Sequence, residues 1–87
     1  MGYPIFIDPL PSDFTSTELM ALLRPFGNVV WAKVAYDSVG KSLRFGHAEM
    51  QTAEEADNVC KHLHRAVFRG ATLTVLRAEG TEIDPNG

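Results

Sequence analysis

The feature that constrains this sequence most is a capped amphipathic helix pattern that occurs twice between stretches typical of β-strands. Thr15 is followed three residues later by Glu18, and Thr52 by Glu55, which is the capping-box arrangement of a helix start. Each box leads into apolar residues at helical spacing. These are Leu19, Leu22, Leu23 and Phe26 in the first segment, and Ala56, Val59, Cys60 and Leu63 in the second. Each predicted helix is apolar on one side only, so it needs another layer to cover.

Four stretches rich in β-branched and aromatic residues surround the two helices. They span residues 3–8, 28–37, 42–50 and 71–78, and a short "SVGK" turn joins the second to the third. The resulting order is β-α-β-β-α-β. We therefore predict an α+β, ferredoxin-like fold with a four-stranded antiparallel sheet and both helices on one face. Right-handed crossovers place the first and third strands side by side in the centre.

Alternation along the two central strands predicts what the uncovered sheet face carries. Phe6 lies between Ile5 and Ile7, so it points away from the helices if the isoleucines face them. On the third strand, Gly46, Ala48 and Met50 form the predicted core set, and Phe45, His47 and Glu49 form the predicted solvent set. We expect Phe6, Phe45 and His47 to form one exposed aromatic patch. Such a patch usually marks a binding surface.

These residues give the chain a resemblance to the RNA recognition motif, over residues 3 to about 79. The stretch "IFIDPL" (5–10) is similar to the hexamer of that family, and "LRFGHAEM" (43–50) is similar to its octamer. The flanking stretches "FGNV", "GKS" and "FRGATLTV" agree as well. Four sites depart from the family pattern. Pro9 replaces Asn, Leu43 and Arg44 replace a basic–Gly pair, Met50 replaces the last aromatic residue, and His47 replaces the second stacking aromatic residue.

The resemblance implies that the chain binds two to four nucleotides of single-stranded RNA, with micromolar or weaker affinity. Phe6 and His47 would each stack under one base, and Phe45 would pack against the sugars between them. Lys33 and Arg77 would lie at the edges of the aromatic patch and contact phosphate or base edges. Thr74 would contact a base edge. Arg44 or Lys41 would supply the positive charge that is absent at position 43. The particular protein is not identified by these motifs.

A protein-interaction module of the same fold is the alternative. In that case Trp31, Phe6 and Leu76 would form an apolar patch for a partner protein on the sheet face. Salt separates the two readings, because RNA binding weakens steeply with ionic strength and apolar docking does not. Trp31 itself is either a packing residue over the loops or a contact residue. The oligomeric state stays open.

The charge distribution requires any attraction to phosphate to be local. The formal net charge is −3. Residues 1–78 hold eight basic and eight acidic groups, so the deficit comes from the three acidic residues of the final stretch "EGTEIDPNG". The body is therefore neutral, and no global field steers an anion toward it. We take residues 3–79 as the domain and expect residues 80–87 to be an acidic, flexible tail.

Other classes of function are disfavoured by what the sequence lacks. No stretch approaches the roughly 20 apolar residues of a membrane span. Cys60 is the single cysteine, which excludes an internal disulfide and favours a reducing compartment, cytoplasm or nucleus. We expect it to be an inert thiol. His62 and His64 are two residues apart on a helix, so they point to different sides and are a poor metal pair.

Catalysis is disfavoured on similar grounds. Acylphosphatases share the ferredoxin-like fold and hold phosphate with an arginine in the loop after the first strand, but "DPLPSDF" contains none. The carboxylates of Asp8 and Glu49 lie on or near the predicted open face, with no convincing nucleophile beside them. We expect them to tune specificity or repel phosphate. The sequence thus predicts a binding module with no catalytic activity and no cofactor.

Overall fold

The structure of the chain is a computed structural model that describes residues 2–78. Its elements are β1 (Tyr3–Asp8), α1 (Ser16–Leu23), the 3₁₀-helix η1 (Arg24–Phe26), β2 (Val29–Tyr36), β3 (Ser42–Met50), α2 (Ala53–Leu63), β4 (Val67–Phe68), β5 (Ala71–Thr72) and β6 (Thr74–Arg77). The predicted tail, residues 80–87, lies outside the described residues.

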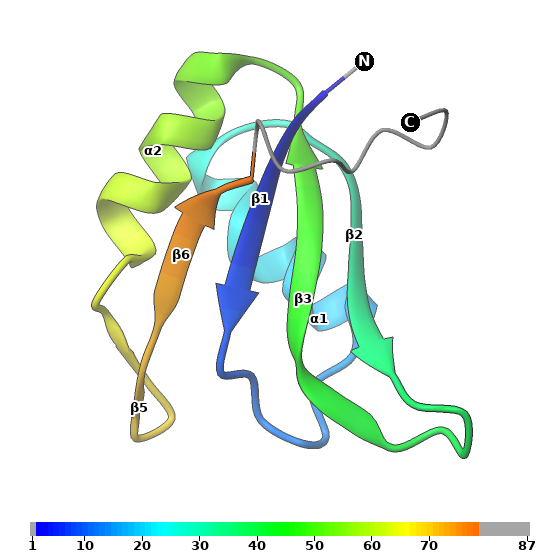
Figure 1. Ribbon diagram of the computed structural model, residues 1–87. Helices are drawn as coiled ribbons and strands as arrows, with labels where there is room; N and C mark the ends of the chain where they lie inside the picture. The colour runs from blue at the N-terminus through cyan, green and yellow to red at the C-terminus, as the bar shows by residue number, and fades with distance from the viewer. Residues whose placement is uncertain (1, 79–87) are drawn as a thin grey trace.

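A four-stranded antiparallel sheet organises the chain, with the strand order β2-β3-β1-β6. The central pair is β1 and β3, as the sequence predicts. Figure 1 shows the two helices together on one side of this sheet, with α1 behind it and α2 beside β6. The α+β, ferredoxin-like prediction is confirmed in strand order and in layering.

The core lies between the sheet and the helices. On the sheet side, Ile5 and Ile7 of β1 are fully buried, as are Ala48 and Met50 of β3. The helices contribute their predicted stripes to the same cluster: Leu19, Leu23, Ala56, Val59 and Leu63. Burial of this apolar surface is the main stabilising term for a domain of this size. It also fixes the phase of the central strands, because the residues between the buried ones must point to the opposite face.

Both helices begin with the predicted capping boxes. The Thr15 hydroxyl accepts a hydrogen bond from the Glu18 N–H at 3.1 Å, and the Glu18 carboxylate accepts one from the Thr15 N–H at 2.9 Å. Thr52 and Glu55 repeat this arrangement at the start of α2. The first helix ends earlier than its apolar pattern suggests, because η1 replaces α-helix after Leu23. Pro25 has no N–H to donate to the α-helical ladder, which explains the change.

The predicted fourth strand over residues 71–78 is wrong as a single element. Leu73 bonds backward to the segment after α2, since its N–H donates to the Ala66 carbonyl at 2.9 Å and its carbonyl accepts from the Arg65 N–H at 2.8 Å. From Thr74 onward the chain pairs with β1 instead. The stretch therefore divides into β5, which forms a hairpin with β4, and β6, which joins the main sheet.

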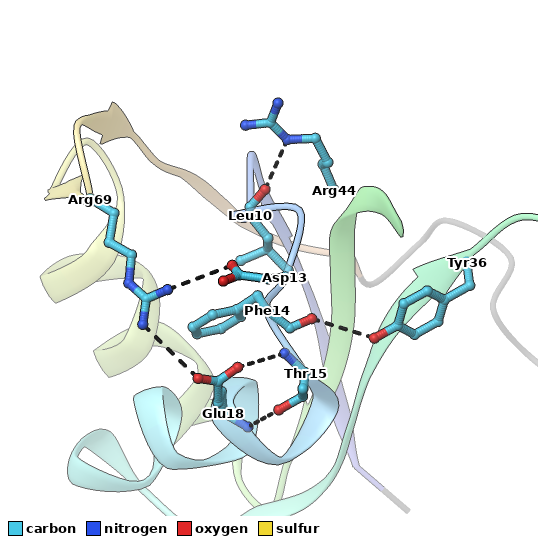
Figure 2. Close-up of polar contacts among 8 residues, drawn as sticks. All are labelled: Leu10, Asp13, Phe14, Thr15, Glu18, Tyr36, Arg44 and Arg69. Atoms are coloured by element: carbon cyan, nitrogen blue, oxygen red, sulfur yellow. Dashed lines mark hydrogen bonds and ion pairs between the residues drawn. The ribbon is translucent and has the colours of Figure 1, made fainter. Parts of the chain in front are cut away.

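The β4–β5 hairpin packs against the loop that follows β1. Its two-residue turn has positive φ at Arg69 (49°) and Gly70 (82°), as a type I′ turn requires. The Arg69 guanidinium lies 5.4 Å from the Phe14 ring centroid and 5.3 Å from that of Phe68. It also approaches the carboxylates of Asp13 and Glu18 at 3.9 and 4.0 Å, as Figure 2 shows.

Candidate nucleic-acid interface

Three rings gather on the sheet face that the helices leave uncovered. Phe6 of β1 is paired directly with His47 of β3, and their ring centroids are 5.4 Å apart. Phe45 lies 5.5 Å from Phe6 and 5.7 Å from His47. All three side chains are half-buried, whereas their neighbours Ile5, Ile7 and Ala48 are fully buried. The structure thus brings the predicted aromatic patch together on the two central strands.

The aromatic patch continues sideways as a row that crosses the whole sheet. On one side His47 is paired with Lys33 of β2, and on the other Phe6 is paired with Leu76 of β6. Lys33 is exposed, so its ammonium is available at the edge where the sequence places it. Leu76 is 50% exposed, which gives the opposite edge an apolar surface. The row therefore offers two rings flanked by one cation and one aliphatic side chain.

Thr74 belongs to the same face. It is paired with Asp8, which lies two residues after Phe6 on β1, and both Thr74 and Asp8 are half-buried. A hydroxyl that donates or accepts and a carboxylate that accepts are therefore side by side next to the aromatic patch. This is the placement that a base-edge role for Thr74 requires.

Arg77 is not part of this surface, contrary to the sequence prediction. Its Cα partner is Ile5, a residue of the buried face, so alternation carries the Arg77 side chain to the helix layer. There its guanidinium donates to the Asp57 carboxylate and, at 3.5 Å, to the Ala53 carbonyl of α2. The alternation of Leu73 and Val75 with Thr72, Thr74 and Leu76 already assigns Arg77 to the buried set. The sequence prediction took its position from the strand end alone, and the register with β1 shows the buried side.

Arg44 lies near the start of β3, beside the loop after β1. Its Nε donates to the Leu10 carbonyl at 3.0 Å, as Figure 2 shows. Its own carbonyl accepts from the Leu10 N–H at 2.7 Å. The backbone of Arg44 has a φ of 64°, a conformation that glycine adopts most easily. This accounts for the glycine at the corresponding place in the family octamer. The Arg44 side chain is exposed and lies against this loop, one residue before Phe45 in the sequence.

Lys41 is exposed but lies away from the rings. It ends the turn between β2 and β3, where the Asp37 carboxylate accepts from the N–H groups of Val39 and Lys41 at 3.0 and 2.8 Å. Four residues separate it from Phe45, the nearest ring in the sequence, which is a span of up to about 13 Å. The structure therefore does not bring Lys41 to the aromatic patch.

A β-bulge adds a residue that sequence reasoning left undecided. The register shifts between Val29 and Trp31, so Trp31 is paired with Glu49 and lies on the open face, while Val29 and Ala32 pack inward. Without the bulge, Val30 would occupy the place of Trp31. The sequence holds one signal of this change: the inward residues Val29 and Ala32 are three apart, which strict alternation does not allow.

The remaining polar candidates have structural roles. The His62 ring stacks on Phe26 with centroids 5.1 Å apart, and His64 Nδ1 accepts from the Val75 N–H at 3.1 Å. Burial raises the pKa of the Cys60 thiol, which keeps it in the unreactive protonated form. Across residues 2–78, no three His, Cys, Asp or Glu side chains are grouped to hold a metal ion. None of the helices in that range is long and apolar enough to cross a membrane.

The fold and the open face together define a class of protein: a small binding module that presents rings on an uncovered antiparallel sheet. The sequence model of the RNA recognition motif matches residues 5–74, and the chain belongs to that family. Membership of this family makes it a binding module and not an enzyme, as the sequence predicts.

Individual relatives agree with this assignment. The chain is 32% identical to mouse scaffold attachment factor B1 over 87 residues, which is 99% of this chain and 9% of that protein. It is similar to the crystal structure of RNA Binding Protein PG1, with a TM-score of 0.84 and 29% identity over 88% of this chain and 94% of that one. RNA recognition domains 1 and 2 of Drosophila melanogaster Sex-lethal give a TM-score of 0.82 and 25% identity, covering 87% of this chain and 49% of theirs. The chain spans less than a tenth of the curated relatives it matches.

Proposed function

We propose that this domain binds short single-stranded RNA on its open sheet face. Phe6 and His47 each stack under one base, and Phe45 packs against the sugars between them. The observation that carries this proposal is the contact of the three rings on β1 and β3, beside an exposed lysine, on a face that no described element covers.

Stacking supplies most of the affinity in this proposal. Base–aromatic stacking contributes about 1–3 kcal/mol per base. Histidine has a small ring, so the stacking contribution of the base on His47 is expected at the low end of that range. Two stacked bases and a few backbone contacts lead to binding in the micromolar range or weaker, at about −8 kcal/mol.

Charge has a smaller part because the face is mixed. Lys33 lies at one margin of the aromatic patch, and Asp8 and Glu49 lie on the same face. Lys33 and the exposed Arg44 attract phosphate, and the carboxylates favour the N–H donors of base edges over phosphate. A face of this kind discriminates between bases more than it attracts RNA of any sequence.

The relatives support an RNA ligand without identifying it. The structure of RNA Binding Protein PG1 and the RNA recognition domains of Sex-lethal are named for RNA binding, and both share this fold over most of the chain. The protein-interaction alternative is favoured by one observation: Leu76 and Trp31 extend the aromatic patch with apolar surface on both sides. That alternative predicts binding to a protein partner with an affinity that does not depend on salt.

Fluorescence anisotropy with labelled random octamers of single-stranded RNA tests the proposal. The 87-residue protein is expected to bind with an affinity that falls as salt rises. Replacing Phe6 and Phe45 together by alanine is expected to remove most of it. Phe26→Ala, which removes a ring from the helix layer, is the matched control and should leave RNA binding intact. Unchanged affinity in the double variant would contradict the proposal.

A further inference from the structure

A second row of side chains crosses the open face beside the first. The register pairs Glu49 of β3 with Pro4 of β1 on one side and with Trp31 of β2 on the other. Directly opposed residues of this kind have Cβ atoms about 5 Å apart. The bulge at Val30 creates this row, because it turns Trp31 outward. Bulges commonly redirect a side chain next to a functional site.

The polar groups of Trp31 and Glu49 have no bonding partner among the described residues. Between residues 2 and 78, the Glu49 carboxylate makes no hydrogen bond or ion pair, and the Trp31 indole N–H makes no hydrogen bond. Both side chains are half-buried, so each is partly open to a ligand. A planar apolar ring and an unpaired acceptor are therefore adjacent on the proposed RNA-binding face.

The position of Glu49 depends on the small residue beside it. A Cβ added at Gly2 would lie 2.5 Å from Glu49 Oε1 and 2.8 Å from Glu49 Cβ. Gly2 thus leaves the space that the Glu49 side chain occupies. A side chain at position 2 would require Glu49 or the backbone at position 2 to shift.

The chemistry of this pair selects one base. An ionised carboxylate is an acceptor with two oxygens and no donor. Guanine carries two neighbouring N–H donors, N1–H and the N2 amino group, on its Watson–Crick edge, so both oxygens can be used at once. Adenine and cytosine offer one amino group on that edge, and uracil offers one N–H between two carbonyl oxygens that a carboxylate repels.

We propose that Trp31 and Glu49 form an additional base site on the open face, in which guanine stacks on Trp31 and donates N1–H and N2–H to Glu49. This inference rests on the proposed RNA-binding function. Glu49 lies two residues beyond His47 on the same face, about 7 Å along the strand. The next nucleotide of an extended strand can span that step after the base on His47.

Trp31 gives a direct readout because it is the single tryptophan of the chain. The intrinsic fluorescence of the 87-residue protein is followed during titration with three RNAs: octauridylate, the same octamer with one central guanine, and that octamer with inosine in place of guanine. The guanine octamer is expected to quench Trp31 and to bind about tenfold more tightly than octauridylate, as one bidentate base contact allows. Inosine lacks the amino group, so its octamer should fall between the other two.

Two variants separate this site from a general loss of folding or charge. Glu49→Gln is expected to abolish the guanine preference, so that the guanine octamer and octauridylate bind with the same affinity. Gly2→Ala should also weaken the preference although it changes no charge. Glu54→Gln, an exposed carboxylate on α2, is the control and should keep the preference of the unmodified protein.

The outcomes distinguish this inference from the function it rests on. Suppose that the RNAs bind and that Phe6→Ala weakens their binding, but guanine is not preferred or Trp31 fluorescence is not quenched. The proposed base site is then wrong, and the proposed RNA binding stands. A guanine preference that survives Glu49→Gln also overturns the site. If none of the three octamers binds, both proposals fail.

Discussion

Phe6 and His47 are direct partners across β1 and β3, with ring centroids 5.4 Å apart and ring planes inclined by 58°. The pairing is a consequence of the buried face, since Ile5 and Ala48 must be inside together. The core therefore positions the two rings that we propose to stack on bases, and both rings lie on strands of the sheet. Such a surface is formed before the ligand arrives, which lowers the entropy lost on binding.

A larger ring at position 47 should strengthen RNA binding. His47→Phe widens the stacking surface, and we expect affinity to rise by about 0.5–1 kcal/mol, a modest part of the contribution of one stacked base. Anisotropy titrations with the same random RNA measure this change. The matched control is His62→Phe in the helix layer, where the ring stacks on Phe26 and should not alter RNA affinity. Weaker binding by His47→Phe would argue that the imidazole acts through a hydrogen bond instead of stacking.

Lys33 should contribute charge and little else. Lys33→Gln is expected to weaken binding to all RNA sequences by a similar factor and to reduce the slope of log K against log salt by about 0.7, the value for one phosphate on a single strand. Lys61→Gln on α2 makes the same charge change away from the open face. Equal slopes for Lys33→Gln and the unmodified protein would remove Lys33 from the interface.

Glu55 should make the stability of the fold depend on acid pH. The hydrogen bond from the Asn28 N–H, together with those from Thr52, holds the pKa of this carboxyl below its ordinary value of 4.5. The unfolded chain therefore takes up this proton at a higher pH than the folded chain, so the stabilisation is complete above about pH 5 and is lost as pH falls below 4.5.

Thermal unfolding between pH 7 and pH 3 measures this effect. The Tm difference between the unmodified protein and Glu55→Gln should be largest at neutral pH and should shrink in acid. Glu54→Gln, in the same turn of α2, is the control, for which no such convergence is expected. A difference that stays constant down to pH 3 would show that the carboxylate charge is not what stabilises this contact.

Arg69 should stabilise the junction between the β4–β5 hairpin and the loop after β1. Its guanidinium contacts the rings of Phe14 and Phe68, and its two ion pairs are exposed and weak. We expect Arg69→Ala to lower the free energy of unfolding by about 1–2 kcal/mol, mostly from the lost cation–π contacts. Arg65→Ala is the control because Arg65 also has positive φ (69°), so both variants carry the same backbone effect. Equal losses in urea unfolding would mean that the ring contacts contribute nothing.

Local patterns were sufficient to predict the fold and the aromatic patch. The two capping boxes set the helix starts, and the alternation of Phe6 with Ile5 and Ile7 set the open face, because each depends only on residues near in sequence. The family motifs pointed to the same two strands.

The errors arose in the last strand. Arg77 was assigned to the edge of the aromatic patch because it ends a strand, although its alternation with Leu73 and Val75 puts it on the buried side, and its register with Ile5 places it under α2. The division of the last strand at Leu73 depends on hydrogen bonds to Ala66 and Arg65, which no local pattern of residues 71–78 contains. The bulge at Val30, by contrast, has a local signal, because the inward residues Val29 and Ala32 are three apart.

An NMR titration of isotope-labelled protein with a pool of random short single-stranded RNA tests the central proposal most directly. The account predicts amide shifts centred on Phe6, Phe45, His47 and Lys33, with the α2 surface unaffected. No shifts at low salt and near-millimolar protein concentration, or shifts confined to the helix layer, would contradict the assignment of the open sheet face as an RNA-binding surface.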